Sequence, residues 1–99
     1  MIKHVVMWTI KNTKDSSRTD NINKVQEKLN ALPSLIREIR DYEIGVNFAE
    51  SPAAFDIVLI SSFETESDFK VYRDHPEHIK VKHFINTVRD QAVVVDFQK

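Results

Sequence analysis

The chain has 99 residues, 41% apolar and 29% charged, and its 14 Lys and Arg nearly balance its 15 Asp and Glu to give a net charge of −1. This length predicts a single domain over residues 1–99, and the balanced charge gives no electrostatic basis for binding nucleic acid. The lack of cysteine and the presence of one glycine, Gly45, exclude disulfides, thiolate metal sites and the glycine-rich loops that hold nucleotide cofactors.

The beginning of the chain predicts a β-strand with apolar residues on both faces. Over residues 2–10, the even positions carry mostly large apolar side chains, and Val5 and Met7 lie on the other side. No apolar run approaches the roughly 20 residues of a membrane span, and Lys3 and His4 interrupt the pattern of a signal peptide. We therefore expect a cytoplasmic protein that does not enter a membrane.

A helix is predicted next. Ser17 followed three positions later by Asp20 is typical of a helix start with an acidic first turn. A buried stripe then recurs at spacings of three and four, and Pro33 must interrupt the helix within it. The stripe consists of Ile22, Val25, Leu29, Leu32 and Ile36.

The rest of the chain predicts two strands, two helices and a final strand. The second strand has alternating apolar residues at Tyr42, Ile44, Val46 and Phe48, and the third covers 55–63. Thr65 or Ser67 caps a short helix, Pro76 begins another that ends near Arg89, and the last strand covers 92–97.

This order, β-α-β-β-α-β, predicts an α+β subunit of the ferredoxin-like plan, with a four-stranded antiparallel sheet and its helices on one face. The other face would be bare, although the first, third and last strands are apolar on both sides. A large exposed apolar face needs a partner, and closed two-fold symmetry is the commonest way for a protein to supply one. We therefore expect a homodimer formed by two sheets packing face to face.

The segment 72–78 carries the strongest candidates for chemistry. His78 shares a helix face with the apolar residues Val81, Ile85 and Val88, so it should point between helix and sheet. Burial and the positive end of the helix dipole would keep its imidazole neutral, as a general base requires. Tyr72 could donate a hydrogen bond to a carbonyl or enolate oxygen.

Structural and metal-binding alternatives stay open for these histidines. A histidine at a helix start more often satisfies a neighbouring polar group than performs catalysis, and His75 is placed to cap the helix before Pro76. His75 and His78 could also bind a metal, with His4 or Asp56 as a third ligand, but two imidazoles are a weak signal. We expect no metal or cofactor.

Polar residues inside the predicted strands are further candidates. His4 lies on the same strand face as Trp8, so it must find a hydrogen-bond partner or line a cavity. Asp56 has the same problem, and a His4–Asp56 pair across adjacent strands would solve both. We take His4, Asp56, Trp8 and His75 as candidate ligand-binding residues, and Asp96 as an edge or turn anchor.

The whole chain resembles the stress-responsive A/B barrel (Dabb) family of dimeric α+β barrels. The resemblance rests on Ile2-Lys3-His4-Val5-Val6, Phe55-Asp56-Ile57-Val58-Leu59, Tyr72-x-x-His75-Pro76-x-His78 and Val93-Val94-Val95-Asp96-Phe97. It implies a ferredoxin-like subunit, a two-fold dimer and a cavity between sheet and helices. It does not imply one function.

One branch of that family is similar to plant polyketide cyclases, which close a poly-β-keto chain by aldol chemistry. The resemblance assigns the tyrosine and histidine of that reaction to Tyr72 and His78, with His4 lining the pocket, whereas a histidine stands at the position of Asp56 in the cyclase. Two hypotheses follow. The protein is a homodimeric module that binds a small apolar or polyketide-like molecule or acts in stress without catalysis, or it is a cyclase with His78 as base and Tyr72 as oxyanion partner.

Overall fold

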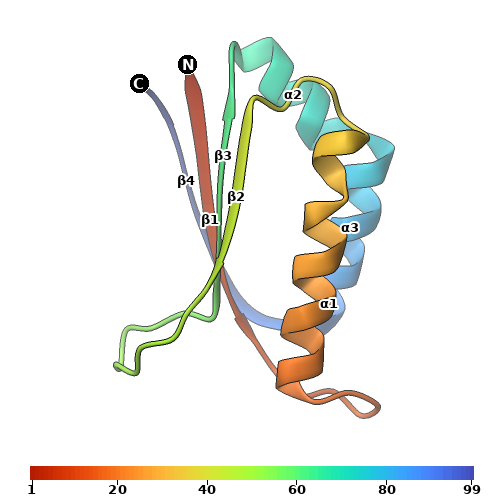
Figure 1. Ribbon diagram of the computed structural model, residues 1–99, viewed down its shortest axis with the longest axis vertical. Helices are drawn as coiled ribbons and strands as arrows, with labels where there is room; N and C mark the ends of the chain where they lie inside the picture. Colours follow the sequence, from red (N-terminus) through yellow and green to blue (C-terminus); the bar gives the residue numbers. More distant parts are fainter.

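The computed structural model describes residues 1–99 as a sheet covered on one face by helices (Figure 1). The strands are all antiparallel to their neighbours and lie in the order β2-β3-β1-β4, as the ferredoxin-like plan requires. The elements are β1 (Ile2–Ile10), α1 (Arg18–Asn30), η1 (Leu32–Ser34), β2 (Asp41–Val46), β3 (Ile57–Phe63), α2 (Glu66–Asp74), α3 (Pro76–Val88) and β4 (Arg89–Gln98).

Each α-helix starts at a side chain that accepts a hydrogen bond from a backbone N–H of the first turn. The Ser17 hydroxyl accepts from the amide of Asp20 at 3.1 Å, and the Thr65 hydroxyl accepts from that of Asp68 at 3.1 Å. The His75 ring Nδ1 accepts from the amide of Glu77 at 3.1 Å. The helix starts predicted at Ser17 and Pro76 are confirmed, and of the two candidates for the short helix, Thr65 is the cap.

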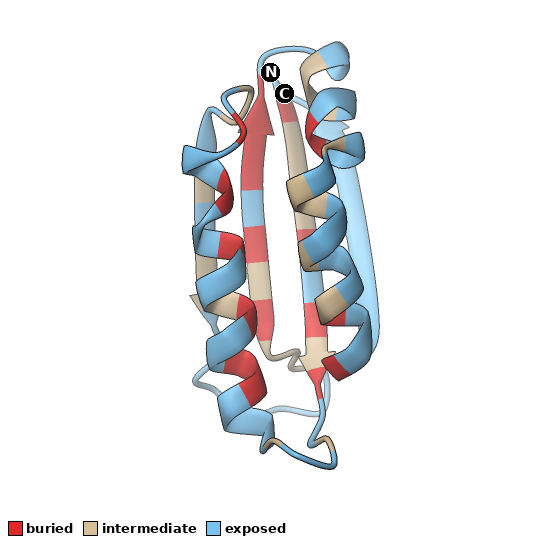
Figure 2. Cartoon of the chain, turned by 90° about the vertical axis from the view of Figure 1, so that its right-hand side faces the viewer, coloured by how far each residue is buried: buried red, intermediate tan, exposed pale blue.

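The buried stripe of the first helix is also confirmed. All five of its residues are buried, and they continue through the short η1 turn at which Pro33 ends the α-helical ladder. In Figure 2 the buried positions of the helices face the sheet and their exposed positions face solvent. The core therefore lies in one layer between helices and sheet.

Three predicted strand limits are wrong by a few residues. Phe48 lies beyond the end of β2 and is 98% exposed, because the pairing of β2 with β3 ends at Val46 and Ile57. Residues 47–56 form a loop that extends to the side of the sheet away from the helices (Figure 1), so β3 begins at Ile57 instead of residue 55. β4 begins at Arg89 instead of residue 92, since Arg89 pairs with Ile10 beyond an irregularity in β1.

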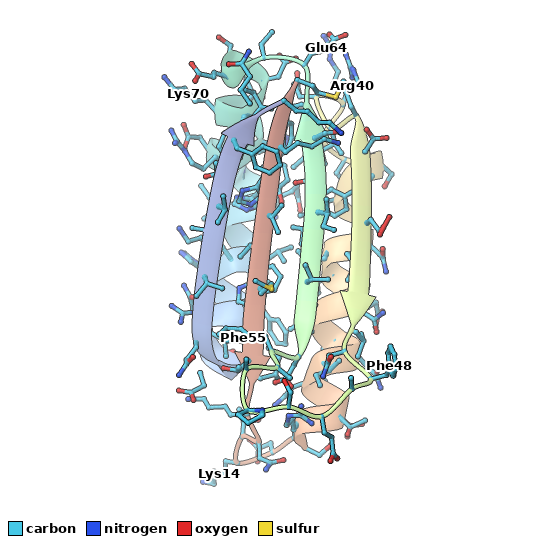
Figure 3. All side chains as sticks on the ribbon, turned by 90° about the vertical axis from the view of Figure 1, so that its left-hand side faces the viewer. Lys14, Arg40, Phe48, Phe55, Glu64 and Lys70 are labelled. Atoms are coloured by element: carbon cyan, nitrogen blue, oxygen red, sulfur yellow. The ribbon has the colours of Figure 1, made fainter.

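The face of the sheet away from the helices is apolar over three strands (Figure 3). The register places side chains of β1, β3 and β4 opposite one another on this open face: Val5, Met7, Val58, Ile60, Val93, Val95 and Phe97. β2 contributes only Asp41, Glu43 and Gly45 to it. The prediction of strands with two apolar faces is confirmed, and the open apolar face is limited to β1, β3 and β4.

The two ends of the chain lie side by side on neighbouring strands (Figure 1). The amino terminus of Met1 donates to the carbonyl of Lys99 at 3.1 Å, and the amide of Lys99 donates to the carbonyl of Met1 at 2.9 Å. The β1–β4 ladder thus continues to both termini.

Candidate functional site

A cavity of about 340 Å³ lies between the helices and the sheet. Its sheet side is formed by alternate residues of β1, namely His4, Val6 and Trp8, because successive side chains of a strand point to opposite faces. Its helix side is formed by the stripe of α3 that begins at His78 and continues through Val81 and Ile85. The cavity therefore has mainly apolar walls, and one group of its polar side chains lies where Tyr72, His78 and His4 meet.

His4 forms its hydrogen bond with Asp96, so the predicted His4–Asp56 pair is wrong. His4 and Asp96 are directly opposite in the antiparallel β1–β4 ladder, and His4 Nδ1 binds Asp96 Oδ1. On the other side of β1, His4 lies opposite Ser61, well inside β3. Of the two roles predicted for Asp96, the edge position is confirmed and the turn is wrong, because Asp96 lies on the edge strand β4 and lines the cavity.

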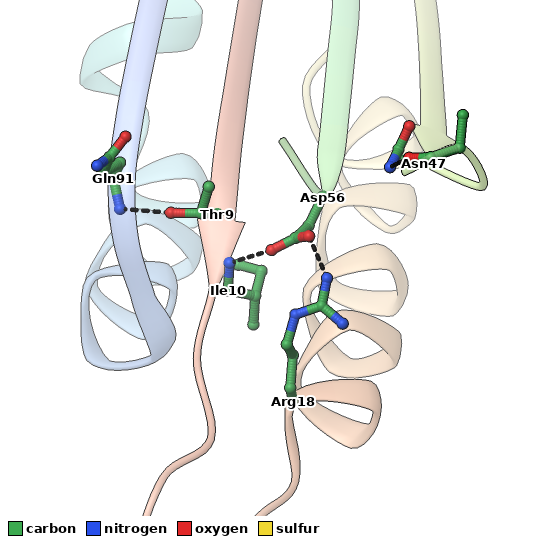
Figure 4. Close-up of polar contacts among 7 residues, drawn as sticks. Thr9, Ile10, Arg18, Asn47, Asp56 and Gln91 are labelled. Carbon is green, nitrogen blue, oxygen red and sulfur yellow. Dashed lines mark hydrogen bonds and ion pairs between the residues drawn. The ribbon is translucent and has the colours of Figure 1, made fainter. Parts of the chain in front are cut away.

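Asp56 lies outside the lining of this cavity and joins β1 to α1 (Figure 4). Its carboxylate accepts a hydrogen bond from the backbone N–H of Ile10 at 2.6 Å and forms an ion pair with Arg18. Its own amide donates to the carbonyl of Trp8 at 2.8 Å. Asp56 therefore stands in this apolar segment because it supplies hydrogen-bond partners to backbone groups at the end of β1, which would otherwise lack them.

The hydroxyl groups of Tyr72 and Tyr42 are 3.0 Å apart and hydrogen bonded. Tyr72 is 1% exposed, and burial raises its pKa to about 12, although the bond with Tyr42 acts in the opposite direction. Burial first, and then Tyr72 itself, also raises the pKa of Tyr42. Both phenols are neutral near pH 7. Tyr42 is a site residue that was not predicted from the sequence, although its place in the alternation of β2 puts it on the helix-facing side.

His78 packs against Tyr72, with 4.4 Å between the ring centroids. Its Nδ1 is 2.9 Å from the carbonyl oxygen of Arg73, and because a carbonyl can only accept, Nδ1 carries the proton. The pKa of His78 is lowered, chiefly by burial and further by the nearby His4, Lys82 and His75, against the effect of the bond to Arg73. In the neutral ring, Nε2 is therefore a hydrogen-bond acceptor.

The comparisons with known proteins identify the family. The family model for the stress responsive A/B barrel domain, Dabb, matches residues 2–99. The chain belongs to the Dabb family. It is 30% identical over 98 residues to a stress-response A/B barrel domain-containing protein of Arabidopsis thaliana, of whose length it spans 36%.

Solved structures share the whole fold of this Dabb domain. A dimeric protein of ferredoxin-like fold from Bacteroides fragilis has a TM-score of 0.81 and 28% identity, over 99% of this chain and 95% of that one. A hydroxynitrile lyase from Passiflora edulis has a TM-score of 0.82 and 15% identity, over 97% and 90% of the two chains. The second likeness is one of fold alone.

His75 caps α3 in this Dabb domain and does not line the cavity. Of the candidate ligand-binding residues, the structure brings His4 and Trp8 together with Tyr72 and His78, and it leaves His75 and Asp56 outside. No group of three or more His, Cys, Asp or Glu side chains is placed to hold a metal ion. No helix has the length and apolar character needed to cross a membrane.

The stability of this Dabb domain should depend on pH, because folding lowers the pKa of His78. The pKa of His78 is lowered in the folded state, from an unfolded value of about 6.5. As the pH falls below that value, the unfolded chain therefore binds more protons than the folded chain does. The free energy of unfolding should be at its full value above that pH and should fall as the pH drops through the folded pKa. Urea unfolding between about pH 8 and pH 5 measures this.

The matched variants are His78→Gln and His83→Gln, the latter at an exposed position of the same helix. The pH dependence should be shallower in His78→Gln and unchanged in His83→Gln. Equal slopes for wild type and both variants would contradict the assignment to His78.

The hydrogen-bonded hydroxyls of Tyr42 and Tyr72 predict a non-additive double mutant. Tyr42→Phe leaves the hydroxyl of Tyr72 buried without its partner and should cost about 1–3 kcal/mol, and Tyr72→Phe should cost a similar amount. Replacing both removes both hydroxyls, so the double variant should lose less than the sum of the single losses. Urea unfolding of the four proteins tests this, and additive losses would show that the two hydroxyls do not interact.

Proposed function

We propose that this Dabb domain is a homodimer that binds a small, largely apolar molecule in the cavity between α3 and the sheet. The observation that carries the proposal is the cavity itself, about 340 Å³, with apolar walls and a few convergent polar groups. Pockets of about 300–1,000 Å³ with this character are typical sites for small molecules. The cavity lies near the lower limit of this range of pocket volumes, so it would hold a small ligand.

The polar groups would fix the orientation of the ligand. The neutral His78 offers Nε2 as an acceptor, and the His4–Asp96 pair presents a second imidazole 6.2 Å, between ring centroids, from Tyr72. Tyr72 already shares its hydroxyl with Tyr42. The comparisons do not favour the polyketide-cyclase alternative, and the arrangement supports binding of a carbonyl or hydroxyl group by these residues.

The open apolar face supports the dimer. Three neighbouring strands present exposed valine, isoleucine, methionine and phenylalanine side chains there, while the edge strand β2 is polar. An unpartnered surface of this kind is a liability for a monomer. The similar protein from Bacteroides fragilis is dimeric, and it is 28% identical to this chain. The second copy would therefore sit over β1, β3 and β4.

The binding proposal is tested by filling the cavity. Ala92 lines it from the exposed strand β4, so Ala92→Phe should occupy the space at little cost in stability, whereas Ala53→Phe places the same ring on the exposed 47–56 loop. Native mass spectrometry of each purified protein reports its stoichiometry and any retained ligand. Binding of the probe 2-naphthamide, followed by NMR shifts, should be lost in Ala92→Phe and kept in Ala53→Phe.

Two results would contradict the proposal. One is a wild-type protein that retains no ligand and gives no cavity shifts with the probe. The other is equal binding by the two phenylalanine variants.

A further inference from the structure

The cavity opens beside the edge strand β4. Val94 lies opposite Val6 in the ladder and so faces the helix side, yet it is 55% exposed. Every residue of β4 after Arg89 is exposed, and β4 is one of the two edge strands. The mouth of the cavity is therefore a groove with an apolar floor on β4 and a wall on α3.

Basic side chains line this mouth. Lys82 and Asn86 on α3 and Arg89 at its C-cap are four and three positions apart, a spacing that places them on one side, next to the apolar stripe that begins at His78. Arg73, at the end of α2, lies on the same lining. Three cationic side chains thus share the lining of one small cavity.

Lys82 and Arg89 have no carboxylate partner. Lys82 forms no ion pair, and Arg89 uses its guanidinium on the side-chain oxygen of Asn86 at 2.8 Å and the carbonyl of Asp90 at 3.2 Å. Arg73, the third cation of the cavity lining, differs from Lys82 and Arg89 because it forms an ion pair with Asp74. Two full positive charges remain uncompensated at the rim.

The cavity lining carries fewer negative than positive side chains. The acidic side chain in its lining is Asp96, which is hydrogen bonded to His4. An apolar floor beside uncompensated cations is complementary to a molecule with an apolar body and an anionic head, and ionic hydrogen bonds are roughly twice as strong as neutral ones. A neutral ligand would leave this part of the site unused.

We infer that the ligand is an amphiphilic carboxylate whose apolar body lies on β4 and in the cavity and whose carboxylate binds Lys82 and Arg89. This inference rests on the proposed function and adds the chemical class of the ligand. The carboxylate is held at the mouth, beside the second half of α3, and the apolar body occupies the rest of the cavity.

The test compares two probes of the same shape, 2-naphthoate and 2-naphthamide, which differ in charge at the head group. The wild-type protein should bind the naphthoate about tenfold or more tightly at low salt, and added salt should reduce that difference. The double variant Lys82→Gln, Arg89→Gln should bind both probes with the affinity that wild type has for the amide. Lys80→Gln, Arg37→Gln changes the same charge at exposed positions outside the cavity and should behave as wild type.

The outcomes separate the two proposals. If wild type binds both probes equally, or if the Lys82, Arg89 variant keeps the preference for naphthoate, the inference is wrong while the binding function stands. If neither probe binds the wild-type protein although circular dichroism shows that it is folded, the binding function itself fails.

Discussion

Val95→Asp should convert the proposed homodimer into a folded monomer. Val95 is 62% exposed near the middle of β4, opposite Val5 on the open apolar face. In the proposed dimer the new carboxylate would be buried between two sheets without a partner. A buried interfacial charge without a partner weakens the free energy of association by about 2–5 kcal/mol. The dissociation constant should rise by a factor on the order of 100 or more.

Sedimentation equilibrium over a range of concentrations measures this constant. Val71→Asp is the matched control, because Val71 is an exposed valine of α2 on the other side of the molecule. It should leave the dimer intact. A Val95→Asp protein that associates as strongly as wild type would show that the open face is not the interface.

Phe63→Ala should cause the largest loss of stability of any single truncation near the site. Phe63 is fully buried, and its ring centroid lies 5.3 Å from that of Phe69 and 5.0 Å from that of Tyr72. Removing a buried phenyl ring costs about 3–5 kcal/mol, from lost transfer free energy and from the void that remains. Because Tyr72 and Phe69 line the cavity, probe binding should weaken as well.

Urea unfolding at a fixed protein concentration measures the loss, since the stability of the proposed dimer would depend on concentration. Phe48→Ala removes the same ring from the 47–56 loop, where it is solvated, and should change the free energy of unfolding by no more than about 0.5 kcal/mol. Similar effects of the two substitutions would contradict the packing described for Phe63.

Local patterns in the sequence predicted the parts of the site that depend on a single element. The alternation of β1 placed His4 and Trp8 on the helix-facing side, and the spacing on α3 turned His78 toward the sheet. Helix starts followed from the same kind of information, because a cap needs only the residues of its own first turn. These features are confirmed by the structure.

Pairings between elements could not be predicted in this way. The partner of His4 depends on which strand lies beside β1 and in what register, and periodicity within one strand contains neither. The same is true of Tyr42 and Tyr72, which come from a strand and a helix far apart in the chain. Asp56 was assigned to the wrong partner because its role at the end of β1 becomes visible only when β1 and α1 are both in place.

The first and last residues of the sequence lie next to each other, because Met1 and Lys99 are hydrogen bonded at the end of the β1–β4 ladder. Met1 and Lys99 are joined by two backbone hydrogen bonds, so a short peptide linker could connect them without moving either strand. New ends could then be opened in the 47–56 loop, which contributes no residue to the cavity lining. A circularly permuted chain would therefore run from β3 through β4 to β1 without a break, with the binding site unchanged.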